Sequence, residues 1–171
     1  MPKPVTKKSV KPVSDSRVEM TEIVLPNHTN QLGTIFGGQL VAWIDIAGSI
    51  AASRHSRTVC VTASIDTMHF VAPVRVGQIV NIYASVNYTG RTSMEIGVRV
   101  DSEDPRSGHR THVATAYLTF VAVDQNGHPI EIAQVNPESS EEKRRFHEAE
   151  LRRKARLALK KTLEKKQQQP I

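Results

Sequence analysis

The sequence predicts an α+β fold in which an antiparallel sheet wraps around one long buried helix. Residues 39–53 place apolar side chains on nearly every side of a helix, which is typical of a helix that is buried all round. Four segments rich in Val, Ile, Thr and Tyr follow, and no second helix intervenes before residue 137. Long consecutive strands with short turns favour an antiparallel sheet, and a sheet can cover such a helix only by curling around it.

The predicted elements follow one another simply. Residues 17–25 alternate apolar and polar side chains and end at Pro26, which predicts a half-buried strand. Residues 27–36 contain turn formers and predict a loop. The helix begins after Gly37 and Gly38, and basic residues at 54–57 suit its C-terminus. The four strands that follow are predicted at 58–70, 78–88, 92–101 and 110–123.

The positive charge of the chain lies at its two ends. The 171 residues carry a formal net charge of +6. Residues 1–12 contribute +4 and residues 141–166 contribute +6, so the segment 13–140 is mildly acidic at −4. A nucleic-acid-binding domain concentrates positive charge on a folded face, whereas this distribution indicates solvated tails. No specific nucleic-acid partner is therefore expected.

Composition divides the chain into three parts. Residues 1–15 lack periodicity and predict a flexible basic arm. Residues 16–137 form the folded domain, and residues 138–171 predict a charged C-terminal helix, over 138–166, with a short tail; this helix is packed loosely or projects. No apolar run reaches the roughly 18 residues of a membrane span, and the start lacks the apolar stretch of a secretory signal. Because the single cysteine, Cys60, excludes an internal disulfide framework, a cytoplasmic location is expected.

Asp45 is the unusual residue of the predicted helix. A carboxylate near the middle of a buried helix is costly unless it is paired, protonated or faces a wet cleft. Two explanations fit the composition equally well. Asp45 either has a structural role, capping a neighbouring loop or pairing with Arg54 or Arg57, or it carries a function.

The loop before the helix favours a function. Asn30 lies in a polar segment, and Gly37 and Gly38 stand where the helix begins. A glycine pair there lets a ligand approach free backbone N–H groups, where the helix dipole favours negative charge. Such groups suit the oxyanion of an acyl transfer, although a glycine pair also serves simply as a tight entry into a helix. Carboxylate, amide side chain and free N–H groups together indicate hydrolysis of a carbonyl compound without a metal.

The segment 28–45, HTNQLGTIFGGQLVAWID, resembles the signature of the acyl-CoA thioesterases related to the brain-type and brown-fat-inducible cytosolic acyl-CoA hydrolases. AASRH at 51–55, VTASID at 61–66 and RTSME at 91–95 resemble further segments of that family. The resemblance runs in order over roughly residues 17–123, which makes it more specific than a lone motif. It implies the hotdog fold, a long helix wrapped by an antiparallel sheet, in agreement with the predicted layout.

The resemblance implies hydrolysis of fatty acyl-CoA to free fatty acid and CoA. It assigns Asp45 to the helix carboxylate regarded as general base or nucleophile. It assigns Asn30 to the loop asparagine that orients the water or the thioester across a dimer interface. The amide of Gly38 or a neighbour would polarise the carbonyl. A dimer with two complete sites is implied, assembled as a trimer of dimers, and no metal or cofactor is expected beyond the CoA of the substrate.

Further residues are candidates for substrate contacts. Arginine is the expected partner of the CoA phosphates, and the turn at 91–93 is a candidate phosphate-facing loop. Each candidate also has an ordinary explanation as a surface arginine, a polar strand residue or a helix-entry glycine. The substrate-binding candidates are Gly37, Arg57, Thr62, Ser64, Arg75, Arg91, Thr92 and Ser93.

Other chemistries find less support. His28, His55 and His69 fit no common metal-binding spacing, and His69 is expected to be a packed, hydrogen-bonded strand residue. The sequence has no Gly-x-Ser-x-Gly elbow, Walker loop or dinucleotide fingerprint. One alternative is a non-catalytic acyl-CoA sensor with the basic C-terminal helix as its output. A hotdog dehydratase is disfavoured because no histidine occurs within 37–53.

Overall fold

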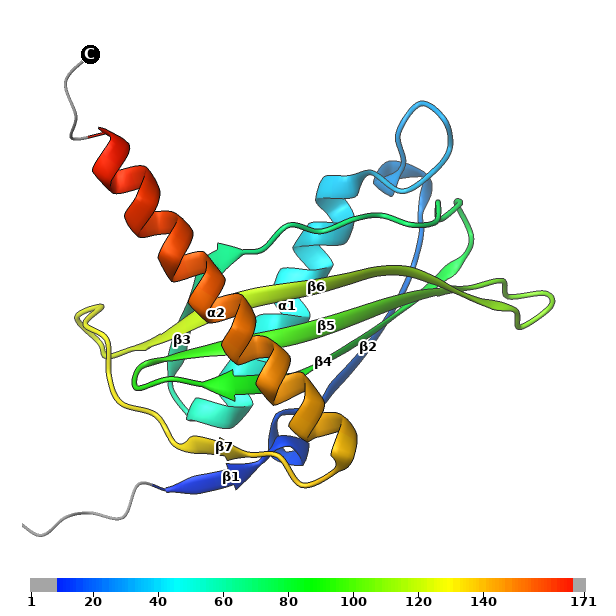
Figure 1. Ribbon diagram of the computed structural model, residues 1–171. Helices are drawn as coiled ribbons and strands as arrows, with labels where there is room; N and C mark the ends of the chain where they lie inside the picture. The colour runs from blue at the N-terminus through cyan, green and yellow to red at the C-terminus, as the bar shows by residue number, and fades with distance from the viewer. Residues whose placement is uncertain (1–8, 168–171) are drawn as a thin grey trace, which may run out of the picture.

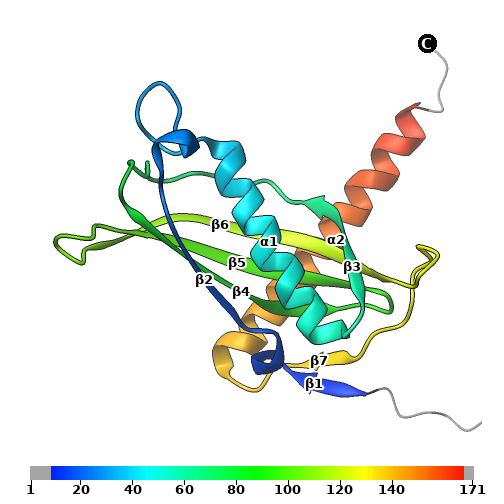
Figure 2. The same ribbon diagram turned by 180° about the vertical axis from the view of Figure 1, so that it is seen from behind.

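The computed structural model describes residues 9–167 and places two helices on opposite faces of one sheet (Figures 1 and 2). Two short 3-10 helices, η1 and η2, lie near the N-terminus. The elements are β1 (Val10–Pro12), η1 (Val13–Ser16), β2 (Val18–Ile23), η2 (Pro26–His28), α1 (Gly37–Ser56), β3 (Val59–Ile65), β4 (Ile79–Thr89), β5 (Ser93–Glu103), β6 (Arg110–Val123), β7 (Gln134–Asn136) and α2 (Ser140–Gln167).

The main sheet confirms the predicted fold class. Its five strands are antiparallel in the order β2-β4-β5-β6-β3, so β2 and β3 are the edges. The sheet curls over α1, and apolar side chains from α1 and from the strands that face it form one core. The helix approaches the sheet closely at Gly48, where an added Cβ would lie 3.0 Å from the Phe120 ring.

One chain covers only one side of α1, which corrects the expectation of a helix buried all round. Leu40, Ile44 and Ala47 are fully buried against the sheet, whereas Ile46 and Ile50 are 48% and 37% exposed. The edge strand β3 is also apolar and open, with Val59, Val61 and Ile65 exposed. The apolar pattern of the helix therefore predicts burial on all sides, but the sheet of a single chain buries only one side.

The N-terminal segment departs from the predicted flexible arm. Residues 1–8 lie outside the described residues, but Val10–Pro12 forms β1, which pairs in parallel with β7. The Lys11 ammonium group donates a hydrogen bond of 2.6 Å to the carbonyl of His55 in the last turn of α1. A cation at a helix C-terminus is favoured by the helix dipole. This contact ties the segment to the domain.

The predicted strand 58–70 is too long. Strand β3 ends at Ile65, and residues 66–74 continue beside β6 as an irregular segment with a single bridge between Phe70 and Ala114. His69 is exposed in this segment, so the expectation of a packed strand histidine is wrong. The preceding strand already bends at the register shift between Thr62 and Ser64.

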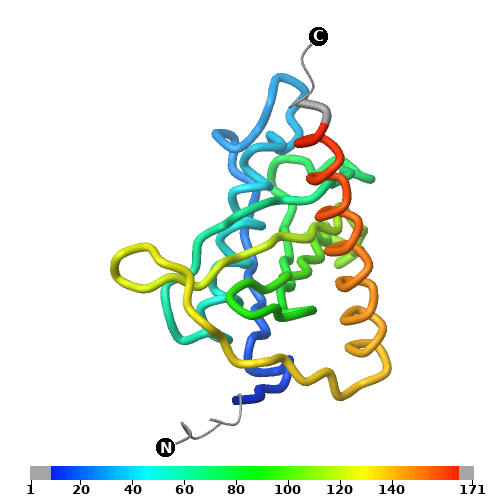
Figure 3. Tube along the Cα trace, turned by 60° about the vertical axis from the view of Figure 1, so that its left-hand side comes forward, coloured from blue at the N-terminus to red at the C-terminus, as the bar shows by residue number. Residues whose placement is uncertain are grey.

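The first half of α2 packs firmly across the outer face of the sheet, opposite α1 (Figure 3). Ala149 is fully buried there. The Arg152 guanidinium group lies 2.7 Å from Glu95, which is 3% exposed, and 3.5 Å above the ring of Tyr117. The helix continues beyond the sheet, where Leu159 and Leu163 are exposed. No helix within the described residues is long and apolar enough to cross a membrane.

Candidate active site

Asp45 lies in the third turn of α1, beside the edge strand β3. Its Oδ1 accepts a hydrogen bond of 2.7 Å from the Thr62 hydroxyl. The Asp45 side chain is partly exposed, because it points to the side of α1 that the sheet leaves open. The desolvation cost expected for a fully buried carboxylate is therefore reduced in a single chain.

The structural explanation for Asp45 does not hold within the described residues. Arg54 donates to the backbone carbonyl of Arg17, and neither Arg54 nor Arg57 forms an ion pair with Asp45 there. The only side-chain partner of Asp45 in that part of the chain is Thr62. The threonine holds one carboxylate oxygen and leaves the other available to a ligand or a water molecule.

The N-terminus of α1 offers free N–H groups. The carbonyl of Phe36 accepts hydrogen bonds from the amides of Gln39 and Leu40, at 2.9 and 3.2 Å. The amides of Gly37 and Gly38 have no acceptor within residues 9–167, as expected for the first turn of a helix. At position 38 an added Cβ would lie 2.6 Å from Cε1 of Phe36, so any larger residue there requires the exposed Phe36 ring to move.

Asn30 organises the loop that leads into α1. Its Oδ1 accepts a hydrogen bond of 2.9 Å from the amide of Leu32, and its Nδ2 donates to the Thr34 hydroxyl at 3.0 Å. Gly33 turns the loop with a φ of 69°. Asp45 follows Gly37 by about 12 Å along the helix axis at 1.5 Å per residue. One chain therefore does not bring Asn30 and the free amides into contact with Asp45.

The arginine candidates lie at two opposite ends of the sheet. Arg57 ends α1 in the left-handed conformation, with a φ of 59°, and Arg91 occupies the β4–β5 turn near the start of β3. Arg75 lies at the other end, bridged to Thr34. In the part of the chain that the structure describes, the Arg91 side chain has a single ion pair, a long exposed contact of 3.4 Å with Glu131. Within one chain these arginines neither converge nor reach Asp45.

The remaining candidates occupy strand and turn positions. Ser64 is half-buried two residues beyond Thr62, after the register shift in β3. Thr92 and Ser93 are half-buried, and their carbonyls accept hydrogen bonds from Ala122 and Gly90. Their side chains lie at the same end of the sheet as Arg91.

A second group of polar residues lies on the outer face, and sequence analysis overlooked it. The His112 ring contacts Asp101 at 3.1 Å through Nδ1 and the Thr115 hydroxyl at 3.2 Å through Nε2. Although burial acts to raise it, hydrogen bonds from Arg99 and His112 hold the pKa of Asp101 below its usual value. The alignment of Asp101 opposite His112 in the β5–β6 register was the signal that would have revealed this group.

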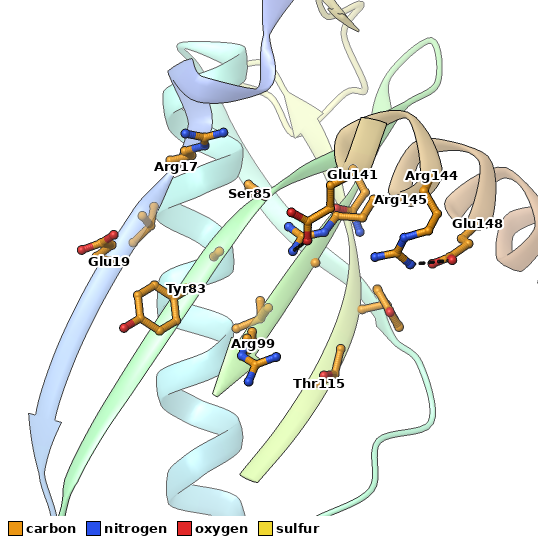
Figure 4. Close-up of a pocket in the computed structure, with 16 residues that line it drawn as sticks. Arg17, Glu19, Tyr83, Ser85, Arg99, Thr115, Glu141, Arg144, Arg145 and Glu148 are labelled. Atoms are coloured by element: carbon orange, nitrogen blue, oxygen red, sulfur yellow. Dashed lines mark hydrogen bonds and ion pairs between the residues drawn. The ribbon is translucent and has the colours of Figure 1, made fainter. Parts of the chain in front are cut away.

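Thr115 borders an outer cleft of about 420 Å³ between α2 and the sheet (Figure 4). Its four arginines are already paired: Arg17 with Glu142, Arg99 with Asp101, Arg144 with Glu148 and Arg145 with Glu141, at 3.0, 2.9, 2.6 and 2.5 Å. The backbone amides of its floor are engaged in the strand ladder, so the cleft lacks free N–H donors for an oxyanion. The volume of this outer cleft therefore does not make it a better acyl-transfer site than the surroundings of Asp45 and the helix amides.

His28 and His55 both make packing or hydrogen-bond contacts that indicate a structural role. The His28 ring packs edge-on against Trp43 with centroids 5.2 Å apart. His55 is fully buried, and its Nε2 lies 2.9 Å from the carbonyl of Ala133. Burial lowers the pKa of His55, so the neutral ring is favoured.

Comparison with known proteins places the chain in a family. The family model described as the thioesterase superfamily matches residues 32–109. The uncharacterized acyl-CoA thioester hydrolase YkhA of Bacillus subtilis is 42% identical over 128 residues, which are 75% of this chain and 74% of that protein. Acyl-coenzyme A thioesterase 11 of Mus musculus is 37% identical over 147 residues, but the chain spans only 25% of its length.

Solved structures indicate the same family as the sequence relatives. The chain matches an apo-hexameric acyl-CoA thioesterase with a TM-score of 0.85 and 43% identity, over 88% of this chain and 96% of that one. It matches an acyl-CoA hydrolase from Staphylococcus aureus, in complex with butyryl coenzyme A, coenzyme A and coenzyme A disulfide, with a TM-score of 0.82 and 36% identity, over 93% and 99% of the two chains. Mutants of the latter replace an asparagine, an aspartate or a threonine by alanine. The chain therefore belongs to the thioesterase superfamily, as a member of the hotdog-fold acyl-CoA thioesterases.

Proposed function

We propose that the protein hydrolyses fatty acyl-CoA to a free fatty acid and CoA, with Asp45 as general base or nucleophile. The observation that carries the proposal is the 2.7 Å hydrogen bond between Thr62 and Asp45 on the open side of α1. It orients a solvent-accessible carboxylate that has no cationic partner within the described residues. A carboxylate in this state accepts a proton or attacks a carbonyl carbon.

The complete site is proposed to form between two subunits. Asp45 and Thr62 would come from one, and Asn30 and the Gly38 amide from the other, because one chain keeps the two pairs apart. The open apolar face of α1 and the β3 edge provide a surface for a second copy. Two related structures are described as hexameric, which supports assembly as a trimer of dimers.

The S. aureus mutants support the same residues. The asparagine, aspartate and threonine altered in that acyl-CoA hydrolase match Asn30, Asp45 and Thr62 in type and in spacing along the chain. Three residue types at two matching intervals are a specific coincidence in a relative that is about 35% identical.

In the proposed reaction, Asp45 takes a proton from a water molecule held beside Asn30 of the partner subunit. The water oxygen attacks the thioester carbonyl carbon, and the oxyanion accepts a hydrogen bond from the amide of Gly38. The C–S bond then breaks, and the CoA thiolate leaves and gains a proton. Direct attack by Asp45 through a mixed anhydride is the competing route. Single turnover in ¹⁸O-water tests for the anhydride, because attack of water on its aspartyl carbonyl places ¹⁸O in the Asp45 carboxylate, which general-base catalysis never does.

The CoA moiety is proposed to bind through the arginine candidates. Arg57 and Arg91, with Thr92 and Ser93 nearby, lie at one end of the sheet, and Arg75 lies at the other. Thr62 and Ser64 would face the pantetheine arm along β3. No further cofactor is proposed, since the reaction needs only water. Cytosolic acyl coenzyme A thioester hydrolase of Rattus norvegicus is 36% identical, which supports a cytosolic location.

Thiol release from a series of acyl-CoA substrates tests the proposal. Asp45→Ala and Asp45→Asn are expected to lower kcat/KM by about 10²–10⁴, the usual contribution of a general base. Glu19→Ala, a matched loss of an exposed carboxylate on the outer face, is expected to leave activity unchanged. Gel filtration and thermal unfolding check that assembly and folding survive. Wild-type activity in Asp45→Ala would rule out the assignment.

The acyl-CoA sensor remains the alternative, with the basic helix as its output. A cut after Pro137 would remove Ala149 and Arg152 from the sheet and leave the buried Glu95 without its cation, so it is a poor test. A cut after Leu157 removes only the projecting part of α2. Tight acyl-CoA binding without turnover, together with loss of binding to RNA or anionic vesicles on this truncation, would favour the sensor.

A further inference from the structure

Three hydrogen-bonded side chains lie together on the outer face of the sheet, opposite α1. The Thr115 hydroxyl lies 3.2 Å from Nε2 of His112, and Nδ1 of the same ring lies 3.1 Å from Oδ1 of Asp101. A hydroxyl, an imidazole and a carboxylate in this order, each within hydrogen-bond reach of the next, form the arrangement that activates a hydroxyl as a nucleophile. We call Thr115, His112 and Asp101 the outer triad.

A β-bulge in β6 brings the outer triad together. The register between β5 and β6 shifts at Asp101, which leaves Val113 as an extra residue in β6. Val113 and its neighbour Ala114 are both buried in the core. His112 and Thr115 therefore share the outer face, although residues three apart in a regular strand point to opposite faces. Bulges are common beside functional sites, where they re-aim a side chain.

Asp101 is held in the state and orientation that the ring of His112 requires. Nε of Arg99 donates a hydrogen bond of 2.9 Å to Oδ2 of Asp101, which leaves Oδ1 to the ring. Although burial acts to raise it, hydrogen bonds from Arg99 and His112 hold the pKa of Asp101 below its usual value, so the carboxylate is ionised at neutral pH. An ionised carboxylate at Nδ1 keeps the proton there. Nε2 of the neutral ring is then free to accept the proton of the Thr115 hydroxyl.

The Thr115 hydroxyl is open to a large ligand. Thr115 is exposed and lines the outer cleft of about 420 Å³, where it lies beside Arg99 on the neighbouring strand (Figure 4). The rings of Tyr83 and Tyr117 line the same cleft, together with four arginines and three glutamates, so positive charge is in slight excess. Aromatic rings and arginines suit a ligand that has both hydrocarbon and anionic parts, as an acyl-CoA has.

We propose that Thr115 is an acylation site, which takes an acyl group from acyl-CoA independently of Asp45. The Thr115 oxygen attacks the thioester carbonyl carbon while Nε2 of His112 takes the hydroxyl proton. The new C–O bond forms, the C–S bond breaks, and His112 passes the proton to the departing CoA thiolate. The products are an O-acylthreonine ester and free CoA. Asp101 is a positioning residue, since it acts through the ring of His112.

The cleft also explains why the acyl group stays on the threonine. Because the strand ladder engages the backbone amides of the cleft floor, an oxyanion at Thr115 finds no backbone donor among the described residues. A missing oxyanion donor costs about 10²–10³ in rate, in the hydrolysis of the ester as in its formation. A thiolate leaves far more readily than the alkoxide of threonine, so formation is faster than hydrolysis. The outer triad is therefore expected to give an acylated chain without turnover.

The test is intact-mass spectrometry of the Asp45→Ala protein after incubation with octanoyl-CoA, because this variant is expected to spare the donor. A gain of a single acyl group that alkaline hydroxylamine removes is expected, since hydroxylamine cleaves esters and leaves lysine amides intact. Peptide mapping should place the ester at Thr115. Adding Thr115→Val should abolish the ester, whereas adding Thr115→Ser, which keeps a hydroxyl and removes a methyl group, should preserve it.

Variants of the other two residues test the triad itself. His112→Gln keeps a polar side chain but no base, and should slow ester formation at least about 100-fold. Asp101→Asn should slow it at least tenfold and change the tautomer of His112, read from the ¹⁵N shifts of the ring, which a merely structural loss would not do. Thr111→Val, which removes another exposed threonine of β6, is the matched control and should leave ester formation unchanged.

The outcomes separate this inference from the proposed function. If no ester forms at Thr115, or if it forms as fast in His112→Gln, the inference is overturned and the outer triad is a hydrogen-bonded surface cluster. Hydrolysis at Asp45, measured as thiol release by the wild type, is decided separately. If Asp45→Ala still hydrolyses octanoyl-CoA, the proposed function fails, and the ester is measured with the donor replenished. If thermal unfolding shows that His112→Gln does not fold, the comparison of Thr115→Val with Thr115→Ser decides.

Discussion

The Thr62 hydroxyl donates a hydrogen bond of 2.7 Å to the carboxylate of Asp45 and so joins the edge strand β3 to α1 on the side that the sheet leaves open. Both side chains are accessible in one chain. The hydrogen bond orients the carboxylate without neutralising it. A carboxylate that has no cationic partner in residues 9–167 and lies beside an open apolar surface is the arrangement expected of a site that a second subunit completes.

Loss of the Thr62 hydroxyl should misplace Asp45. A hydrogen bond to a charged group contributes about 1.5–3 kcal/mol, so Thr62→Val is expected to lower kcat about 10- to 100-fold. Thr62→Ser keeps the hydroxyl and should restore most of the activity. Steady-state kinetics of the two variants give the comparison. Equal activities of Thr62→Val and Thr62→Ser would show that the hydroxyl does not position Asp45.

Gly38 should tolerate a methyl group only if Phe36 moves. The added Cβ of Gly38→Ala would meet Cε1 of Phe36 at 2.6 Å, so the exposed Phe36 ring would have to move at the helix terminus where the amides of Gly37 and Gly38 are free. We expect Gly38→Ala to lower kcat about tenfold by obstructing these amides, with a stability cost of about 1 kcal/mol or less. The double variant Phe36→Ala/Gly38→Ala should recover activity relative to Gly38→Ala. If the two substitutions lower kcat additively in this double-mutant cycle, the Phe36 ring does not mediate the effect of Gly38→Ala.

His55 should make the protein less stable in mild acid. Burial lowers its pKa in the folded state, so below the usual value of 6.5 the unfolded chain binds a proton that the folded chain does not. The free energy of unfolding should be fully retained above pH 6.5. It should fall by up to about 1.4 kcal/mol per pH unit as the pH drops below that value. His55→Gln, measured by urea unfolding from pH 5 to 8, should flatten this dependence, and the exposed His69→Gln should not.

Arg152 should be essential for docking α2. It contacts Glu95 at 2.7 Å and covers the Tyr117 ring at 3.5 Å, and Glu95 is 3% exposed. Arg152→Met would leave a buried carboxylate whose one donor among the described residues is the Asn87 amide, at 3.3 Å. We expect a loss of about 3 kcal/mol in the free energy of unfolding, from denaturant titration.

The partner variant tests the cause of that loss. In Glu95→Gln/Arg152→Met no charge is left unpaired, so most of the stability should return. If the double variant is as unstable as Arg152→Met, the packing of the arginine on Tyr117 matters more than its charge.

The sequence by itself determined the fold class, the order of the main elements and the residues suited to the chemistry. Hydrophobic periodicity indicates which segments form α1 and β2 to β6. The spacing of apolar residues follows from the local geometry of a helix or a strand, so it can be read within each segment. Asp45 was found because a charge interrupts an apolar helix, and the glycines at 37 and 38 because free amides need access. These signals are local, so the linear order of residues contains them.

Only the tertiary structure decided which surfaces are covered and which residues meet. Thr62 reaches Asp45 because β3 lies beside α1 and shifts register after Thr62, a consequence of strand pairing that no local pattern encodes. The apolar pattern of α1 could not tell that one face stays open, because periodicity reports a need for burial and not what provides it. The β1–β7 pairing was missed for a related reason: each strand has three residues, and its stability comes from the other strand and from Lys11 at the end of α1.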